Sequence, residues 1–154
     1  MSSSVLRREA HAQCCWALAN SYMAAASHLL ETHTAETFMP SMFLLLHALE
    51  LHLKSFLIAQ GHSEKQLRDI GHDLVACLRD CNTHGIRSYV SISWIAQLQI
   101  ARLNVYYRDK ELEYFAPKPK SFGNVDRLRN TINQVAKAVV NAITAETFRS
   151  FSSN

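Results

Sequence analysis

Residues that interrupt helices are scarce in this sequence, which has only four glycines and three prolines among 154 residues. Strand-like alternation is also missing, because the β-branched residues are scattered instead of falling at every second position. The apolar stretches, such as FLLLHALELHLKSFLIA, are rich in leucine and alanine, which favour helices. Composition and length together predict one compact all-α domain over residues 1–154, with few sharp turns.

A membrane-spanning run is missing as well. Crossing a bilayer takes about 18 consecutive apolar residues without charge. The richest apolar run is interrupted by polar or charged side chains, namely His47, Glu50, His52 and Lys54. Behind Arg7 and Arg8, the N-terminal segment carries polar residues where a signal peptide has a clean apolar region. We therefore expect a cytoplasmic protein with no membrane contact.

A strong charge of either sign is lacking, since the net charge is only +3. The positive charge gathers at the C-terminal end, where residues 118–154 carry six Lys or Arg against two Asp or Glu. A solvated helix face is the ordinary explanation of such a bias, and contact with a phosphate-bearing partner is the alternative.

The four cysteines form no C-x-x-C pair. Cys77, Cys81 and His84 have helical spacing, and Cys14 or Cys15 would complete a tetrahedral zinc set with them. Because a paired motif and a second His-rich loop are absent, we instead expect reduced cysteines that pack as buried small hydrophobes. No metal and no cofactor is predicted.

Start and stop signals place the first helices. One helix is expected over about residues 5–31, and the next has Pro40 in its first turn and Gly61 as its C-terminal cap. Ser63 and Gln66 resemble a capping box that starts a short helical turn.

The second half of the chain contains three further helices. One is expected over about residues 73–81 between two glycines, and another over about 91–105. Asn124 can cap the last helix. Apolar residues recur there at steps of three and four, at Val125, Leu128, Ile132, Val135 and Val139.

Residues 106–124 contain many aromatics and two prolines, so we expect an ordered extended loop before the last helix. The loop mixes aromatic and basic side chains, namely Tyr106, Tyr107, Arg108, Tyr114, Phe115, Lys118 and Lys120. This mixture is typical of surfaces that bind single-stranded nucleic acid, although tyrosines that close over a bundle look the same. Tyr107, Arg108 and Tyr114 are the candidate binding residues of the loop.

A polar row interrupts the second helix. His47, Glu50 and Lys54 are three and four residues apart and share one helix face. A separate apolar stripe consists of Met42, Leu45, Leu49, Leu53 and Phe56. The row is either a simple ion pair, worth about 0.3–0.5 kcal/mol if exposed, or a partly desolvated site that binds an anion or moves a proton.

His72 and Asp73 follow the turn after this helix. Asp73 suits the N-cap of the next helix, and His72 lies just outside it. If the two helices pack antiparallel, His72 approaches the polar row. We therefore predict one polar cluster of Glu50, Lys54 and His72, with His47 at its edge.

The segment HALELHLKSFLIAQGH followed by GHDLVACL resembles the HEPN superfamily of small helical-bundle domains. The residues that carry the resemblance are Glu50, Leu53, Lys54, His72 and Asp73, and it extends over about residues 5–145. It implies an up-and-down bundle of four to five main helices and a homodimer. It also implies an association with RNA or nucleotides, with bacterial defence or toxin–antitoxin systems, and with a nucleotidyltransferase as a partner protein.

Many HEPN proteins are metal-independent ribonucleases with an Arg followed four to six residues later by a His in a late helix. This chain has no histidine after His84, and Gln134 stands where the late helix would need one. Arg79 and His84 have the required spacing, but at the end of a middle helix. The sequence therefore favours a binding or interaction module, with an endoribonuclease that uses Arg79 and His84 as the alternative.

The first helix is apolar around most of its circumference. One side carries Cys14, Leu18, Tyr22, Ala25 and Leu29, and other sides carry Trp16, Ala19, Met23 and Leu30. One bundle covers only part of such a helix, so we expect a homodimer.

Overall fold

A computed structural model describes residues 3–32, 34–114 and 118–152. The structure is 79% helical, and its described part contains no strand. The elements are α1 (Ser3–Glu31), α2 (Ala35–Ala59), α3 (Glu64–Ile70), α4 (Leu74–Thr83), the 3₁₀ turn η1 (Ile86–Ser88), α5 (Trp94–Arg108) and α6 (Val125–Ser152). The predicted all-α helical bundle is confirmed.

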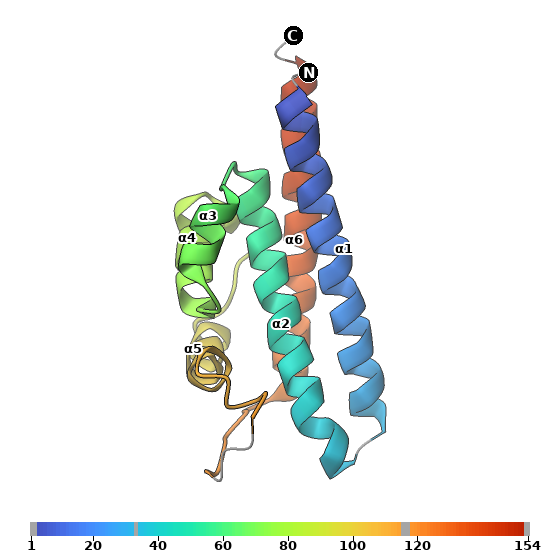
Figure 1. The fold of residues 1–154 in the computed structure, drawn as a ribbon, viewed down its shortest axis with the longest axis vertical. Coiled ribbons are helices and arrows are strands. Elements are labelled where there is room, and N and C mark those ends of the chain that lie inside the picture. The colour runs from blue at the N-terminus through green and yellow to red at the C-terminus, as the bar shows by residue number, and fades with distance from the viewer. Residues whose placement is uncertain (1–2, 33, 115–117, 153–154) are drawn as a thin grey trace.

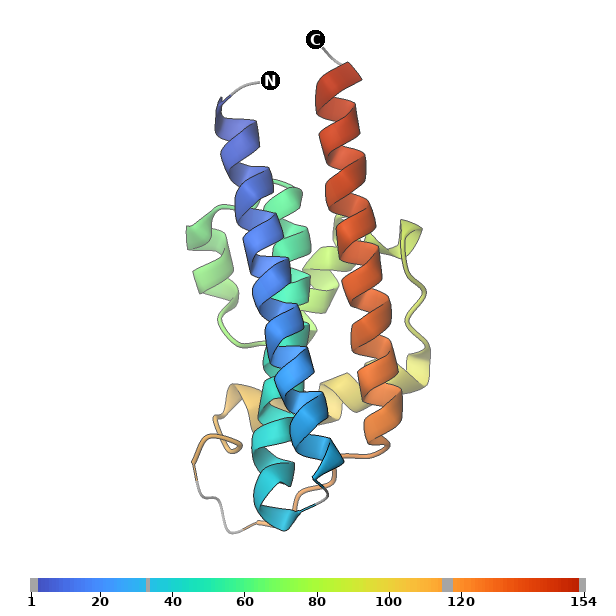
Figure 2. The ribbon, with the colours of Figure 1, turned by 90° about the vertical axis from the view of Figure 1, so that its right-hand side faces the viewer.

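The three long helices α1, α2 and α6 lie side by side, and α1 runs antiparallel to the other two (Figures 1 and 2). The short helices α3 and α4, together with α5, lie on the side of α2 away from α1 (Figure 1). Helix α5 runs across the bundle instead of along it (Figure 2). Helix α2 is therefore covered on both sides.

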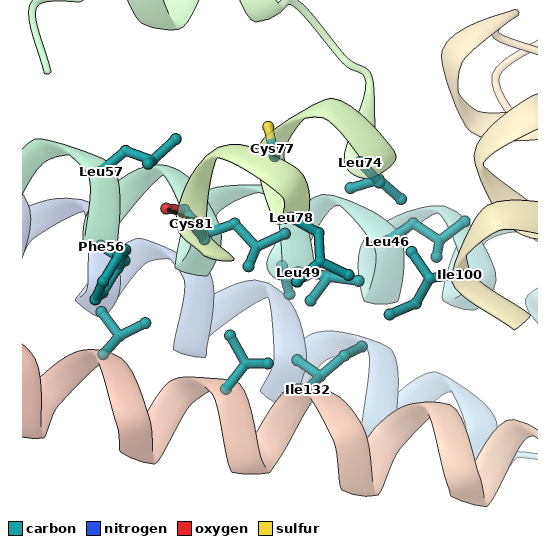
Figure 3. Close-up of a cluster of buried hydrophobic side chains, with 14 of the residues drawn as sticks. Leu46, Leu49, Phe56, Leu57, Leu74, Cys77, Leu78, Cys81, Ile100 and Ile132 are labelled. Carbon is teal, nitrogen blue, oxygen red and sulfur yellow. Dashed lines mark hydrogen bonds between the residues drawn. The ribbon is translucent and has the colours of Figure 1, made fainter. Parts of the chain in front are cut away.

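The core is centred on α2. The predicted stripe of Met42, Leu45, Leu49, Leu53 and Phe56 is fully buried. Figure 3 shows how other side chains of α2 meet α4, α5 and α6, through Leu78, Ile100 and Ile132 among others. Each buried leucine or phenylalanine contributes about 1.5–3 kcal/mol through removal of apolar surface from water. Helix α2 is long and apolar enough to cross a membrane by composition alone, but 72% of its apolar window is buried inside the protein.

Helices α1 and α2 approach closely through small residues. Ala12, Ala19 and Ala26 are seven residues apart on α1 and have no exposed surface. Ser41, Ala48 and Ser55 repeat with the same spacing on α2, and they are fully buried too. The Ser55 hydroxyl donates to the backbone carbonyl of Ala12 at 2.7 Å. Positions seven residues apart lie on the same face of a helix, so the small residues line the α1–α2 contact along its length.

Most of the predicted helix ends are confirmed, but the placement of Pro40 is wrong. Thr34 caps α2, because its hydroxyl accepts from the Thr37 amide, so α2 begins five residues before Pro40. Pro40 therefore lies inside the helix, where it cannot donate to the preceding turn. Gly61 has φ +96 and ends α2 as expected, with the His62 amide donating to the Leu57 carbonyl.

The capping box of Ser63 and Gln66 starts α3, and the Asn124 side chain caps α6 by accepting from the Arg127 amide at 2.7 Å. Helix α5 ends at Arg108, three residues beyond the predicted end. Residues 106–108 are therefore helical, which corrects the expectation that they belong to an extended loop. The predicted loop residue Phe115 lies outside the described residues.

Candidate functional site

The carboxylate of Glu50 is the centre of a polar cluster between α2, α4 and α5. Its side chain is only 2% exposed. Oε1 accepts a hydrogen bond from Lys54 Nζ at 2.6 Å. Oε2 accepts from the Tyr107 hydroxyl at 2.5 Å and from His72 Nδ1 at 3.0 Å. The predicted meeting of Glu50, Lys54 and His72 is confirmed, and Tyr107 is an additional member.

Lys54 ties this cluster to the turn between α3 and α4. Its ammonium donates to the Gly71 carbonyl at 2.7 Å as well as to Glu50. Gly71 has φ +63, a conformation that L residues with a side chain rarely adopt. Because this turn is held by Lys54, the following His72 is brought against Glu50.

Tyr107 and His47 extend the cluster along α2. The Tyr107 hydroxyl donates its proton to Glu50, so its oxygen accepts from His47 Nδ1 at 2.8 Å. His47 therefore carries a proton on Nδ1. Its ring stacks on Phe43, with 5.7 Å between the ring centroids, and meets Tyr22 edge-on at 4.7 Å. His47 thus lies at the edge of the cluster, as predicted.

The protonation states of the two central groups follow from these contacts. Burial by itself raises the pKa of Glu50, but the nearby His47 ring, 3.7 Å away, and hydrogen bonds from Lys54, Tyr107 and His72 reverse this and hold the pKa well below its ordinary value. Burial and the negative charge of Glu50 raise the pKa of Tyr107 well above its ordinary value. At neutral pH the cluster therefore contains a carboxylate and a neutral phenol.

His72 is the member of the cluster that is most open to solvent, with a side chain 51% exposed. Its Nδ1 is occupied by Glu50, which leaves Nε2 for a ligand. A carboxylate that binds one ring nitrogen sets the tautomer and orientation of the imidazole. In the neutral ring Nε2 accepts a hydrogen bond, and in the charged ring it donates one.

Asp73 and Arg108 lie beside His72. Asp73 caps α4, because Oδ1 accepts from the Ala76 amide at 2.9 Å, and it also accepts from Asn104 Nδ2 at 3.0 Å. Burial raises the pKa of Asp73, but these hydrogen bonds and nearby Arg108 lower it overall. The Arg108 guanidinium is 3.8 Å from Asp73 Oδ2 and its side chain is 52% exposed. Asp73 is thus used by the fold, while the half-exposed Arg108, whose Nε donates to Asp109 Oδ1 at 3.1 Å, adds a cation close to Asp73.

The other predicted site residues lie elsewhere. Tyr114 is 68% exposed in the turn after α5 and has no place in the cluster. Arg79 lies near the middle of α4 and His84 is its C-cap residue, whereas His72 precedes its N-terminus. A ten-residue helix is about 15 Å long, so His84 is far from His72. Among the described residues, no hydrogen bond or ion pair joins Arg79 or His84 to Glu50 or His72.

Arg79 and His84 do not form a pair with each other through any contact among the described residues. Arg79 Nε is 3.6 Å from an Asp80 carboxylate oxygen. His84 Nδ1 donates to the Asp80 backbone carbonyl at 2.8 Å, and its ring meets that of His62 at 4.6 Å. His84 ends α4 as its C-cap residue.

Tyr107 was predicted to lie in an extended loop, but the residue is 3% exposed in the last turn of α5. Ile100, Leu103 and Tyr107 are three and four residues apart, so the helical period continues to Tyr107. This spacing could have predicted that Tyr107 belongs to the buried face of the helix. Asn104 was not among the predicted site residues. Its side-chain oxygen accepts from the Leu74 amide at 2.7 Å and so helps to cap α4.

His52 is a second missed residue. It is fully buried on α2, and neither ring nitrogen has a hydrogen-bond partner among the described residues. Burial lowers the pKa of His52 to about 4. His52 is therefore neutral at physiological pH and carries unsatisfied polar atoms inside the bundle.

The cysteines behave as packing residues with one exception. Burial raises the pKa of Cys77 to about 12 and that of Cys15 to about 11. The Cys81 thiol is buried and donates to the Leu53 carbonyl. Cys14 is exposed and Cys15 is only half-buried, which corrects the expectation that all four are buried. In the described part of the chain, no group of three His, Cys, Asp or Glu side chains could hold a metal ion.

The chain matches no protein-family model, and no curated protein or solved structure is significantly similar to it.

Proposed function

We propose that the chain is a HEPN-like, dimeric binding module that holds a phosphate-bearing ligand, RNA or a nucleotide, at His72 and Arg108. The observation that carries the proposal is the arrangement of His72. A buried, ionised Glu50 binds one nitrogen of a half-exposed imidazole and leaves the other nitrogen for a ligand.

The charges around His72 suit a ligand with phosphate and hydroxyl groups. Lys54 balances Glu50, and Arg108 lies close to Asp73, so neither carboxylate is left without a cation. The guanidinium of Arg108 can bind phosphate oxygens in a fork geometry. His72 Nε2 can accept from a ribose hydroxyl or, when charged, donate to phosphate.

The dimer and the cellular setting belong to the same proposal. The α1 face with Cys14, Leu18 and Ala25 is apolar and exposed, which supports a contact with a second copy. Burial of α2 within the bundle supports a cytoplasmic protein without a membrane partner. The HEPN resemblance supports a role in a bacterial defence or toxin–antitoxin system, with a nucleotidyltransferase as partner protein.

Fluorescence anisotropy with a labelled single-stranded RNA, competed by AMP, tests this function. A charge-assisted hydrogen bond contributes about 1.5–3 kcal/mol, so Arg108→Gln and His72→Gln are each expected to weaken binding about tenfold or more. Matched controls are Arg68→Gln and His11→Gln, because both residues are exposed outside the cluster. Equal affinities for all four variants, or no binding by the unmutated protein, would contradict the proposal.

An endoribonuclease is the second candidate function. The contact between the His62 and His84 rings, beside an exposed Arg79, favours it, because two imidazoles and a guanidinium are groups that RNA cleavage uses. The test is to incubate total RNA with the unmutated protein, in the presence of EDTA, and to measure cleavage of the RNA. Cleavage that is lost in His84→Ala and kept in His72→Ala would support Arg79 and His84 as the catalytic pair, and intact RNA would remove the enzyme candidate.

A further inference from the structure

A groove of about 680 Å³ runs between α4, η1 and α5, and no member of the Glu50 cluster lines it. These elements lie on the side of the molecule away from α1 (Figure 1). The floor and walls of the groove are mainly apolar and include Val75, Leu78, Trp94 and Leu98. Two arginines, Arg79 and Arg87, also line it.

The exposed face of α5 continues this apolar surface. Trp94 is 69% exposed, Leu98 59% and Val105 48%, and Ala101 is exposed between them. Their successive spacings are four, three and four residues, the pattern of a seam at which two helices pack. The seam covers about 16 Å of helix, or three turns. A large tryptophan and a leucine on one continuous exposed face mark an interaction surface.

The charge of the groove identifies the kind of partner. Arg87 Nε donates to the neutral Asn82 amide oxygen at 3.1 Å. Arg102 is exposed on α5 next to the seam. No Asp or Glu lines the groove in the described part of the chain. Outside the lining, the Asp80 carboxylate lies 3.6 Å from Arg79 Nε, so the rim of the apolar seam still carries more positive than negative charge.

We propose that this groove, with the seam of α5, is the docking site of an amphipathic helix from another protein that carries acidic residues beside its apolar face. A helix is favoured because the seam has helical spacing and the groove is bounded by helices. A second copy of this chain is disfavoured, because the same surface would bring its own arginines against Arg79 and Arg87 without any lining carboxylate.

The test uses the full chain and two synthetic 18-residue peptides. Both peptides have the same leucine and alanine seam, and their flanking positions are Glu in one and Lys in the other. Anisotropy of a labelled peptide measures affinity, and the emission of exposed Trp94 is expected to shift to shorter wavelength on burial. The Glu peptide is expected to bind at about 10–100 µM and the Lys peptide at least about tenfold more weakly.

Paired variants locate the binding site. Leu98→Ser and Arg87→Gln are expected to weaken binding of the Glu peptide about tenfold. Leu6→Ser is the control for Leu98→Ser, because Leu6 is 52% exposed on α1 and lies outside both proposed contacts, and Arg68→Gln is the control for Arg87→Gln. All four positions are exposed, so unchanged thermal melts are expected; a variant with a lowered melting temperature is replaced by Leu98→Gln or Arg87→Lys.

Three binding results would overturn the proposal. They are no binding of the Glu peptide at about 100 µM, equal binding of both peptides, and equal loss in the control variants. A change of oligomeric state in Leu98→Ser, with the state of Leu6→Ser unchanged, would show that a second copy occupies the groove and would also overturn it.

Discussion

At the residue scale, Glu50 shows how an isolated row of polar side chains becomes part of a core. Three donors from three parts of the chain satisfy its carboxylate, so a charge that is 2% exposed can be kept in the bundle. The outer members, His72 and Arg108, remain accessible. The same cluster therefore joins α2 to α5 and to the turn before α4, and it leaves the His72 imidazole half-exposed.

Lys54→Met is expected to lower the free energy of unfolding by about 3 kcal/mol, because it leaves Glu50 buried without its cation and frees the Gly71 carbonyl. Chemical denaturation at pH 7 measures the change. Lys65→Met is the matched control: Lys65 is 79% exposed in an i, i+4 pair with Asp69, so its loss is expected to cost less than about 0.5 kcal/mol. Similar losses in both variants would show that the Glu50 pair is no more than a surface interaction.

His52 is expected to make stability depend on pH. Its pKa is about 4 in the folded protein and 6.5 when unperturbed, so the unfolded chain binds the additional proton between these values. Stability from this group is complete above pH 6.5 and falls as the pH decreases to 4, by a total of about 3 kcal/mol. The contribution of Glu50, whose pKa is lowered in the folded state, is lost only below its unperturbed value of 4.5.

His52→Leu removes this dependence. Chemical denaturation of both proteins at pH 7, 6, 5 and 4 measures their free energies of unfolding. As the pH falls, the value for the variant is expected to rise relative to that of the unmutated protein. At pH 7 the variant is expected to be at least as stable, because the two unsatisfied ring nitrogens are gone. If the difference in free energy of unfolding between the two proteins stays constant over this range, charged His52 must find a hydrogen-bond partner or contact with water in the folded protein.

At the scale of the elements, the close contact of α1 and α2 depends on small residues. Ala19→Leu, at a position with no exposed surface, is expected to cost about 1–3 kcal/mol, because the two helices have to separate. Ala24→Leu is the control, since Ala24 is exposed on the same helix and is not part of the proposed dimer contact. Thermal melts compare the two variants, and equal melting temperatures would show that the helix contact has room for larger side chains.

At the scale of the whole molecule, two apolar surfaces remain exposed on different sides: the α1 face around Leu18 and the seam of α5 around Leu98. If the chain forms a homodimer through α1, light scattering at micromolar concentration is expected to give a mass of twice 17.4 kDa. Leu18→Glu is expected to yield the monomer, because it introduces a charge into the contact, whereas Leu98→Glu is expected to leave the dimer intact. A monomer of the unmutated protein would contradict the dimer.

The sequence by itself determined the features that depend on neighbouring residues. The capping box of Ser63 and Gln66, the cap at Asn124 and the pairing of Glu50 with Lys54 each involve residues three or four apart, so periodicity and residue type are sufficient to predict them. The buried stripe of α2 followed from the same period. The early start of α2 was missed because Pro40 suits a first turn, whereas Thr34 provides an equally good cap further upstream.

Only the tertiary structure decided which distant side chains join Glu50. Tyr107 is 57 residues away in the sequence and reaches Glu50 because α5 crosses the bundle beside α2. His72 reaches it because Lys54 holds the turn at Gly71. Arg79 and His84 stay apart from this cluster because they lie toward the other end of α4. These outcomes depend on the direction in which one helix packs on another, which is set by the shape of the whole core and leaves no local pattern in the sequence.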